Sequence, residues 1–232
     1  GQPNPTCVLF PNVDGDERSF VLRKKPPGKL LPSAHQVDRE FKAISALQGS
    51  GVPVPKTYAL CTDDGVIGQM FYVMECVEGR IITNPTIPGA TPAERAAIYD
   101  SMNETLAKLH MVDYAAVGLS DFGRQGQYIA RQIDRWTKQY LASKTEEIKA
   151  MNDLMAWLPK HIPAYDPTTI VHGDFRLGNT IVHPTEPRIV AVLDWELCTL
   201  GHPLSDLAYN CLGYYLTEAP HGFANIDVTS LG

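Results

Sequence analysis

Residues 172–179 read HGDFRLGN and residues 190–196 read VAVLDWE, and these two stretches hold the densest polar chemistry of the chain. Apolar segments flank them, so their polar side chains are predicted to stand on loops at strand ends, where catalytic groups commonly lie. Asp174 and Asn179 are separated by a turn that contains Gly178. Asp194 ends a strand predicted over 188–193, which we expect to pair with a strand over 180–183. This pairing would bring the three polar side chains together.

Two carboxylates and a carboxamide form a set of hard oxygen ligands, which suits Mg²⁺ rather than zinc. A Mg²⁺ ion held by few protein oxygens keeps its other positions for phosphates and water, as phosphoryl transfer requires. The remaining carboxylate can then orient an attacking hydroxyl. The three side chains therefore indicate phosphoryl transfer.

The rest of the chain is predicted to form a sheet-rich part followed by a mainly helical part. Strands are predicted over 7–10, 19–24, 56–62 and 70–77, around a helix over 33–48 that Ser33 would cap. After a hinge near 75–80, a capping box at Thr91 opens a helix. Further helices are predicted over 125–143, 146–158 and 204–215, and another short strand over 168–172. The expected fold class is α+β, with a hairpin inserted in the helical part.

The HGD…N motif and the later aspartate resemble those of the aminoglycoside phosphotransferase and choline kinase superfamily, which is related to the protein kinases. The resemblance runs from Gly1 to about Tyr215. More narrowly, VLRKKPPG at 21–28 and the residues WE and GHP between 195 and 203 make the chain similar to the phosphotransferase-like domains that accompany acyl-CoA dehydrogenases. The resemblance implies a protein-kinase-like fold of two lobes. Residues 1–78 would form the nucleotide-binding lobe, and 79–232 a catalytic and substrate-binding lobe that is truncated at its C-terminal end.

The resemblance implies ATP and Mg²⁺ as cofactors and a role for each polar residue of the motif. Asp174 would accept or orient the proton of the substrate hydroxyl, and Arg176 would face the transferring phosphoryl group. Asn179 and Asp194 would hold Mg²⁺ against the phosphates of ATP. His172 would brace the loop.

Two further sets of residues follow from the resemblance. The backbone near Glu75, Cys76 and Val77 would bind adenine. Asp206 would brace the catalytic loop and stay outside the metal set. Residues 1–6, GQPNPT, fall where a phosphate-covering hairpin is expected, although they lack the glycine pattern of protein kinases.

Glu40 is an independent indication of the same site, because it lies on or beside the apolar stripe of the helix predicted over 33–48. A carboxylate there is costly to bury unless it meets a cation. Arg23 is the candidate partner, at the end of a stretch that resembles the V-A-I-K strand of kinases, and it would bind the phosphates of ATP. Arginine stands where lysine is common, and Lys24 or Lys25 takes the role if the register differs. The alternative is that Glu40 reaches solvent.

Composition excludes several other classes of protein. The net charge is −6, and the one basic cluster, at 23–29, is too small for a nucleic-acid footprint. The five cysteines form no CxxC pair, and their odd number argues against a disulfide framework, so we expect a reduced, cytoplasmic compartment. No apolar run approaches the roughly 20 residues that span a bilayer. Both ends of the sequence suggest the interior of a longer protein.

Other functions fit the sequence less well than that of a small-molecule kinase. A two-metal phosphoesterase would need a D-x-H motif, which the sequence lacks. A nucleotide-binding module without catalysis is favoured by Arg23 and by the irregular stretch 1–6. Zinc is disfavoured because the histidines at 172, 183 and 202 are widely spaced. The similarity to domains that accompany acyl-CoA dehydrogenases implies a hydroxyacyl-CoA or a related metabolite as acceptor, rather than an aminoglycoside, and implies association with an acyl-CoA dehydrogenase.

Overall fold

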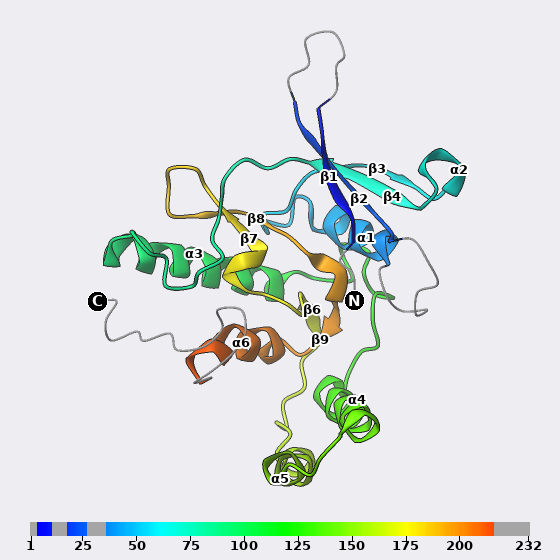
Figure 1. Cartoon of the computed structure of the whole chain (residues 1–232), viewed down its shortest axis with the longest axis vertical. Helices are drawn as coiled ribbons and strands as arrows, with labels where there is room; N and C mark the ends of the chain where they lie inside the picture. The colour runs from blue at the N-terminus through cyan, green and yellow to red at the C-terminus, as the bar shows by residue number, and fades with distance from the viewer. Residues whose placement is uncertain (1–3, 11–17, 27–35, 216–232) are drawn as a thin grey trace.

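The computed structural model describes residues 4–10, 18–26 and 36–215, and all structural statements concern these ranges. An antiparallel sheet of four strands in the order β1-β2-β4-β3 lies at one end of the molecule, with helix α1 against it (Figure 1). The elements are β1 (Thr6–Leu9), β2 (Phe20–Lys24), α1 (Val37–Leu47), β3 (Thr57–Cys61), α2 (Asp64–Ile67) and β4 (Phe71–Glu75). The four predicted strands and the helix are therefore present, whereas the single-turn α2 was not predicted. Ser33, the predicted cap, lies outside the described residues.

Helix α1 forms because its apolar residues recur on one face. Val37, Ala43, Ile44 and Leu47 are buried at helical spacing. Glu40 is buried with them, so the apolar face of α1 carries one carboxylate into the interior. This face packs on β3 and β4 and on the turn at 195–197, and α1 therefore joins the sheet to the second part of the chain.

The second part contains four longer helices and two small sheets. Thr91 begins α3, as predicted, and its hydroxyl accepts a hydrogen bond from the backbone of Glu94 at 3.2 Å. The helices are α3 (Pro92–Met111), α4 (Tyr128–Ser143), α5 (Lys149–Trp157) and α6 (Leu204–Cys211). One sheet pairs β5 (Arg80–Ile81), β7 (Thr180–Val182) and β8 (Ile189–Val192), and the other pairs β6 (Thr169–Val171) with β9 (Thr199–Gly201). The predicted β7–β8 hairpin is confirmed, whereas β5 and β9 were not predicted.

Strand β5 connects the chain leaving β4 to the hairpin that positions the site. Arg80 pairs with Val182 and Ile81 with Ile181. The approach requires a glycine, because a Cβ at Gly79 would lie 2.4 Å from the carbonyl oxygen of Val182. The segment predicted as a hinge thus leads directly into the sheet of β5, β7 and β8.

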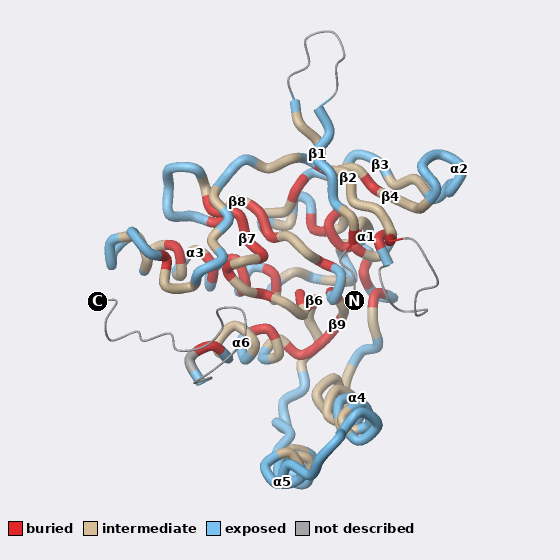
Figure 2. Tube along the Cα trace, in the orientation of Figure 1, coloured by how far each residue is buried: buried red, intermediate tan, exposed pale blue. Residues whose placement is uncertain are grey.

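The buried residues concentrate around α1, α3 and the β7–β8 hairpin, as the red segments of Figure 2 show. Helices α4 and α5 project away from this core and contain no buried residue. Within the described ranges, no helix has the length and apolar character needed to cross a membrane. The division at residue 78 remains a prediction.

Candidate active site

A buried aspartate of α6 fixes the start of the 172–179 loop. Asp206 accepts hydrogen bonds from the backbone N–H groups of His172 and Gly173, both at 2.8 Å. Nε2 of His110, on α3, lies 3.1 Å from the same carboxylate. Only 1% of Asp206 is exposed, so three polar partners compensate the burial of its charge. The predicted bracing role of Asp206 is confirmed.

His172 connects this loop to the segment that carries Asp194. Its Nε2 donates to the carbonyl oxygen of Leu193 at 2.8 Å, and its Nδ1 accepts from the backbone of Asp174 at 3.2 Å. These two roles require a neutral ring, and burial lowers the pKa of His172 in agreement. The predicted structural role of His172 is confirmed.

Gly173 permits a close approach that no other residue would allow. Its φ is +87°, in the region that favours glycine, and an added Cβ would lie 2.8 Å from Cβ of Leu197. The tight turn places Asp174 directly after the two backbone N–H groups that donate to Asp206. The position of Asp174 therefore follows from backbone geometry as well as from its own hydrogen bonds.

Asp174 and Asn179 are in direct contact. Nδ2 of Asn179 donates to Oδ2 of Asp174 at 2.7 Å and to its backbone oxygen at 2.9 Å. Nε of Arg176 lies 3.4 Å from either carboxylate oxygen. Apart from this ion pair, Oδ1 of Asp174 is buried and has no hydrogen-bond partner in the described part of the chain. An unsatisfied carboxylate oxygen beside a half-exposed arginine is a natural place for a hydroxyl or a cation.

Tyr209 adds a hydroxyl to this group. Burial raises the pKa of Tyr209 to about 12, and a hydrogen bond to Asp174 contributes in the same direction. Tyr209 follows Asp206 by one helical turn, so α6 both braces the loop and contacts its carboxylate. Sequence reasoning missed Tyr209, although its i, i+3 spacing from Asp206 could have indicated it.

Asp194 stands beside Asn179 in an unusual backbone conformation. The N–H of Leu193 donates to the carbonyl oxygen of Asn179 at 2.8 Å, which places the two segments side by side. Asp194 has φ 65° and ψ 57°, a left-handed conformation that costs free energy outside glycine and that clusters at functional sites. The structure thus brings Asp174, Asn179 and Asp194 to one place.

Arg23 bridges the two parts of the molecule at this place. Its Nη2 lies 2.9 Å from Oε1 of Glu40 and 2.5 Å from Oδ1 of Asp194. The predicted pairing of Arg23 with Glu40 is confirmed, and the alternative that Glu40 reaches solvent is wrong, since only 1% of Glu40 is exposed. Its Oε2 accepts a hydrogen bond from the Tyr72 hydroxyl at 3.3 Å.

For both Glu40 and Arg23, burial and the charge of the partner shift the pKa in opposite directions. Burial raises the pKa of Glu40 to about 7, although Arg23 opposes this shift. Burial alone would lower the pKa of Arg23, but Glu40 and Asp194 raise it by more, so the guanidinium stays charged. Arg23 is therefore a permanent cation between one titrating and one half-exposed carboxylate.

Glu196 extends the cluster toward the beginning of the chain. Its Oε2 lies 3.9 Å from Nη2 of Arg23 and accepts a hydrogen bond of 3.5 Å from Nδ2 of Asn4. Sequence reasoning missed Glu196 as a site residue. Asn4 is buried, so the described part of the 1–6 stretch lies at the site, whereas residues 1–3 lie outside the described residues.

Two of the three residues predicted to bind adenine line a pocket at the end of the sheet. Glu75 and Cys76 contribute to a pocket of about 810 Å³, together with Val8 in β1 and Phe10 just after β1. Val77 is not among its lining residues. The side chain of Glu75 accepts a hydrogen bond from the backbone N–H of Lys56 at 3.0 Å, and the N–H of Glu75 donates to the carbonyl oxygen of Lys56 at 2.8 Å, so both of these Glu75 groups are already engaged.

The residues present fit a Mg²⁺ ion. Asn179 has an amide oxygen to offer, and the carboxylate of Asp194 is a third exposed, with Arg23 against its Oδ1 in this structure. Among the described residues, no three side chains of the His, Cys, Asp and Glu types gather as a metal site. A site of two protein oxygens would accordingly depend on phosphates and water for its other ligands, as is usual for Mg²⁺.

Comparison with known proteins shows the family of the chain. The family model described as "Phosphotransferase enzyme family" matches residues 12–225. The chain is 51% identical over 235 residues to acyl-CoA dehydrogenase family member 10 of Mus musculus. The match covers 100% of this chain and 22% of the mouse protein. The chain thus spans less than a quarter of that relative.

Solved structures agree on the fold. A crystal structure of a proposed aminoglycoside phosphotransferase from Ralstonia eutropha has a TM-score of 0.87 and 50% identity, covering 100% of the chain and 68% of the bacterial one. A ternary complex of streptomycin, ATP and the phosphotransferase APH(2")-IIa has a TM-score of 0.60 at 18% identity, covering 94% and 73%. The predicted protein-kinase-like α+β fold is confirmed.

Proposed function

Because the chain belongs to the phosphotransferase enzyme family, we propose that it transfers the γ-phosphoryl group of ATP to a hydroxyl of a small molecule. The single observation that carries this proposal is the cluster in which Asp174 contacts Asn179 while Asp194 stands beside them against Arg23. A base, an oxygen-rich cation site and a fixed guanidinium are the parts that phosphoryl transfer uses.

The proposed reaction balances with Asp174 as base. The hydroxyl oxygen of the acceptor forms a bond to the γ-phosphorus, the bond from that phosphorus to the β,γ-bridging oxygen breaks, and ADP leaves. The hydroxyl proton passes to Asp174, whose Oδ1 is the carboxylate oxygen without a hydrogen bond. Arg176, at 3.4 Å from this carboxylate, would offset the charge of the phosphoryl group.

Nucleotide binding would involve both parts of the chain. Asn179 and Asp194 would hold Mg²⁺, which when bound neutralises phosphate charge. Arg23 would contact the α- and β-phosphates, oriented by Glu40. The backbone around 75–77 would bind adenine, and residues 1–78 would form the nucleotide-binding lobe against a catalytic lobe over 79–232.

The acceptor we propose is a hydroxyacyl-CoA or a related hydroxylated acid. The mouse relative is named as a member of the acyl-CoA dehydrogenase family, and association with such a dehydrogenase is part of the proposal. Arg176 lies beside the base with a third of its side chain exposed. A cationic aminoglycoside would meet repulsion there, whereas an anionic acceptor would be attracted.

A nucleotide-binding module without catalysis is the alternative. The 2.5 Å contact between Arg23 and Asp194 favours it, because this contact must loosen before Asp194 can serve a metal ion. The reaction itself distinguishes the two functions. Transfer needs a base at Asp174, whereas binding of a nucleotide does not.

The test is a screen for phosphorylated products with Mg-ATP and a panel of hydroxyacyl-CoAs, hydroxy acids, choline, sugars and aminoglycosides. Mass spectrometry of the acceptor would detect the added phosphoryl group. We expect the parent chain to form a product and Asp174→Asn to lose at least about a hundredfold in rate. A parent no more active than Asp174→Asn, with both binding ATP, would favour the module without catalysis.

A further inference from the structure

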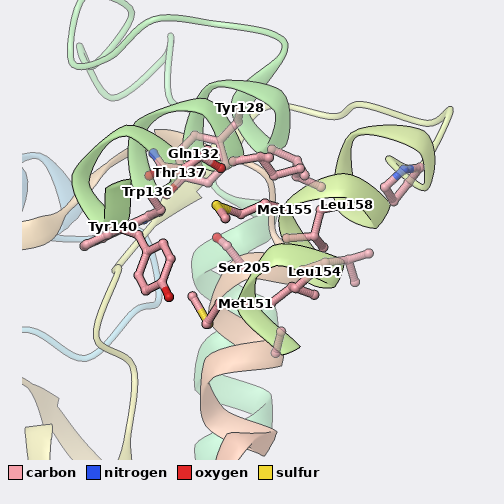
Figure 3. A pocket seen from close by; sticks show the side chains of 15 residues that line it. Tyr128, Gln132, Trp136, Thr137, Tyr140, Met151, Leu154, Met155, Leu158 and Ser205 are labelled. Atoms are coloured by element: carbon pink, nitrogen blue, oxygen red, sulfur yellow. The ribbon is translucent and has the colours of Figure 1, made fainter. Parts of the chain in front are cut away.

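An apolar pocket lies between α4, α5 and α6, apart from the site described above. Its volume is about 540 Å³, within the range of small-molecule sites. Figure 3 shows Trp136 and Tyr140 of α4 facing Met151, Leu154 and Met155 of α5. Ser205 and its neighbours on α6 form the third wall.

The walls of this pocket are apolar although they are open to solvent. Trp136 is 60% exposed, Leu154 44% and Leu204 48%. Neither α4 nor α5 has a buried residue, so their apolar faces are not used by the core. An exposed apolar surface of this kind marks a binding site in a folded protein.

Helix α6 connects the pocket to the catalytic loop. Successive residues of a helix point about 100° apart. Leu204, Ser205 and Ala208 line the pocket, and Asp206 points to the loop at 172–173. Tyr209 points between these two directions, and its hydroxyl is hydrogen-bonded to Asp174. Helix α6 therefore contacts the proposed base, Asp174, on one side and lines the apolar pocket on the next.

From this continuity we propose that the pocket binds an unbranched hydrocarbon segment of the acceptor, whose hydroxyl lies at Asp174. The inference rests on the proposed function for the position of the hydroxyl. The pocket contains few polar groups, and Tyr140 Oη is buried there with no hydrogen-bond partner among the described residues. A hydrocarbon tail that carries one carbonyl would satisfy this hydroxyl, whereas a sugar ring would leave its own hydroxyls unpaired.

The test measures binding in the absence of ATP, so that it does not depend on transfer. The probes are n-alkan-1-ols from butan-1-ol to decan-1-ol, titrated into the 232-residue chain by calorimetry. We expect Kd to fall about three- to fourfold per added methylene as the tail fills the pocket. A Kd that does not change with chain length would overturn the proposal.

A pair of variants on α6 locates the binding. Ala208→Phe places a ring in the pocket, where it displaces two or more methylenes, so Kd for decan-1-ol should rise about tenfold or more. Leu207→Phe is the matched control, because this neighbouring residue lines the separate concavity between α3 and α6. It should leave Kd unchanged. Equal effects of the two variants, with both folded by circular dichroism, would contradict the assignment.

Two further outcomes distinguish the possible errors. Alkanols that bind with the expected slope while no acceptor is phosphorylated would support the pocket and refute the proposed function. If acceptors are phosphorylated but their KM changes neither with tail length nor with Ala208→Phe, the proposed function is supported and the proposed role of the pocket is overturned. If alkanols bind this chain but not the longer bacterial relative, polypeptide fills the pocket in that relative. This result would also overturn the proposal.

Discussion

The buried carboxylate of Glu40 allows a prediction with a definite sign. Its pKa is about 7 in the folded chain, against an ordinary value of 4.5, because burial outweighs the attraction of Arg23. The folded state therefore binds this proton more tightly than the unfolded state does. The resulting stability is fully present below pH 4.5 and is lost as the pH rises through 7.

The substitution Glu40→Gln removes this titration and keeps the shape of the side chain and a partner for the Tyr72 hydroxyl. At about 1.4 kcal/mol per pH unit between the two pKa values, the full loss is about 3 kcal/mol. Between pH 5 and pH 8 the unfolding free energy of the variant should gain about 2.5 kcal/mol relative to the parent. This result would mean that the charged form of Glu40 is kept at a cost in stability.

Urea unfolding of both proteins at pH 5, 6, 7 and 8 measures this difference, since other titrating groups cancel. Glu104→Gln is the matched control, because Glu104 pairs with Lys108 on the exposed side of α3. Its effect should stay within about 0.5 kcal/mol at every pH. If Glu40→Gln instead loses stability relative to the parent as the pH rises, the attraction of Arg23 outweighs burial and the reasoning is refuted.

Three other changes test separate parts of the site. Gly173→Ala should lower Tm by about 6–10 °C, because the new Cβ would meet Leu197 at a positive φ; a shift below about 2 °C in a thermal melt would show that the turn is not fixed. Tyr209→Phe should reduce kcat about tenfold with KM for ATP unchanged, since it removes a hydrogen bond to a charged Asp174; an unaltered kcat would exclude Tyr209 from the site. Arg176→Ala should lower kcat without weakening ATP binding measured by calorimetry, and a loss of binding alone would place Arg176 on the nucleotide instead.

The sequence could predict those parts of the site that depend on local periodicity. The helical spacing of Val37 and Ile44 places Glu40 on the buried face, and the need for a cation then indicates Arg23. The β7–β8 hairpin follows from two short apolar segments with a turn between them. In each case the pattern lies within one element or between neighbours, where side-chain direction is set by the backbone.

The rest depends on contacts between distant residues. Arg23 reaches Asp194 across 171 positions, and no local pattern indicates that one guanidinium serves both Glu40 and Asp194. Strands β5 and β9 have two and three residues, too few to show a period of two, and they exist because the hairpin and β6 offer them partners. Glu196 becomes a site residue only when α1 packs on the 195–197 turn.

The central claim is that Asp194, beside Asp174 and Asn179, holds a magnesium ion against ATP. Calorimetric titration of ATP with and without Mg²⁺, in the parent chain and in Asp194→Ala, tests it most directly. We predict that Mg²⁺ tightens ATP binding at least about tenfold in the parent and has no such effect in the folded variant, a difference of about 1.4 kcal/mol or more. An equal effect of Mg²⁺ in both proteins would contradict the claim.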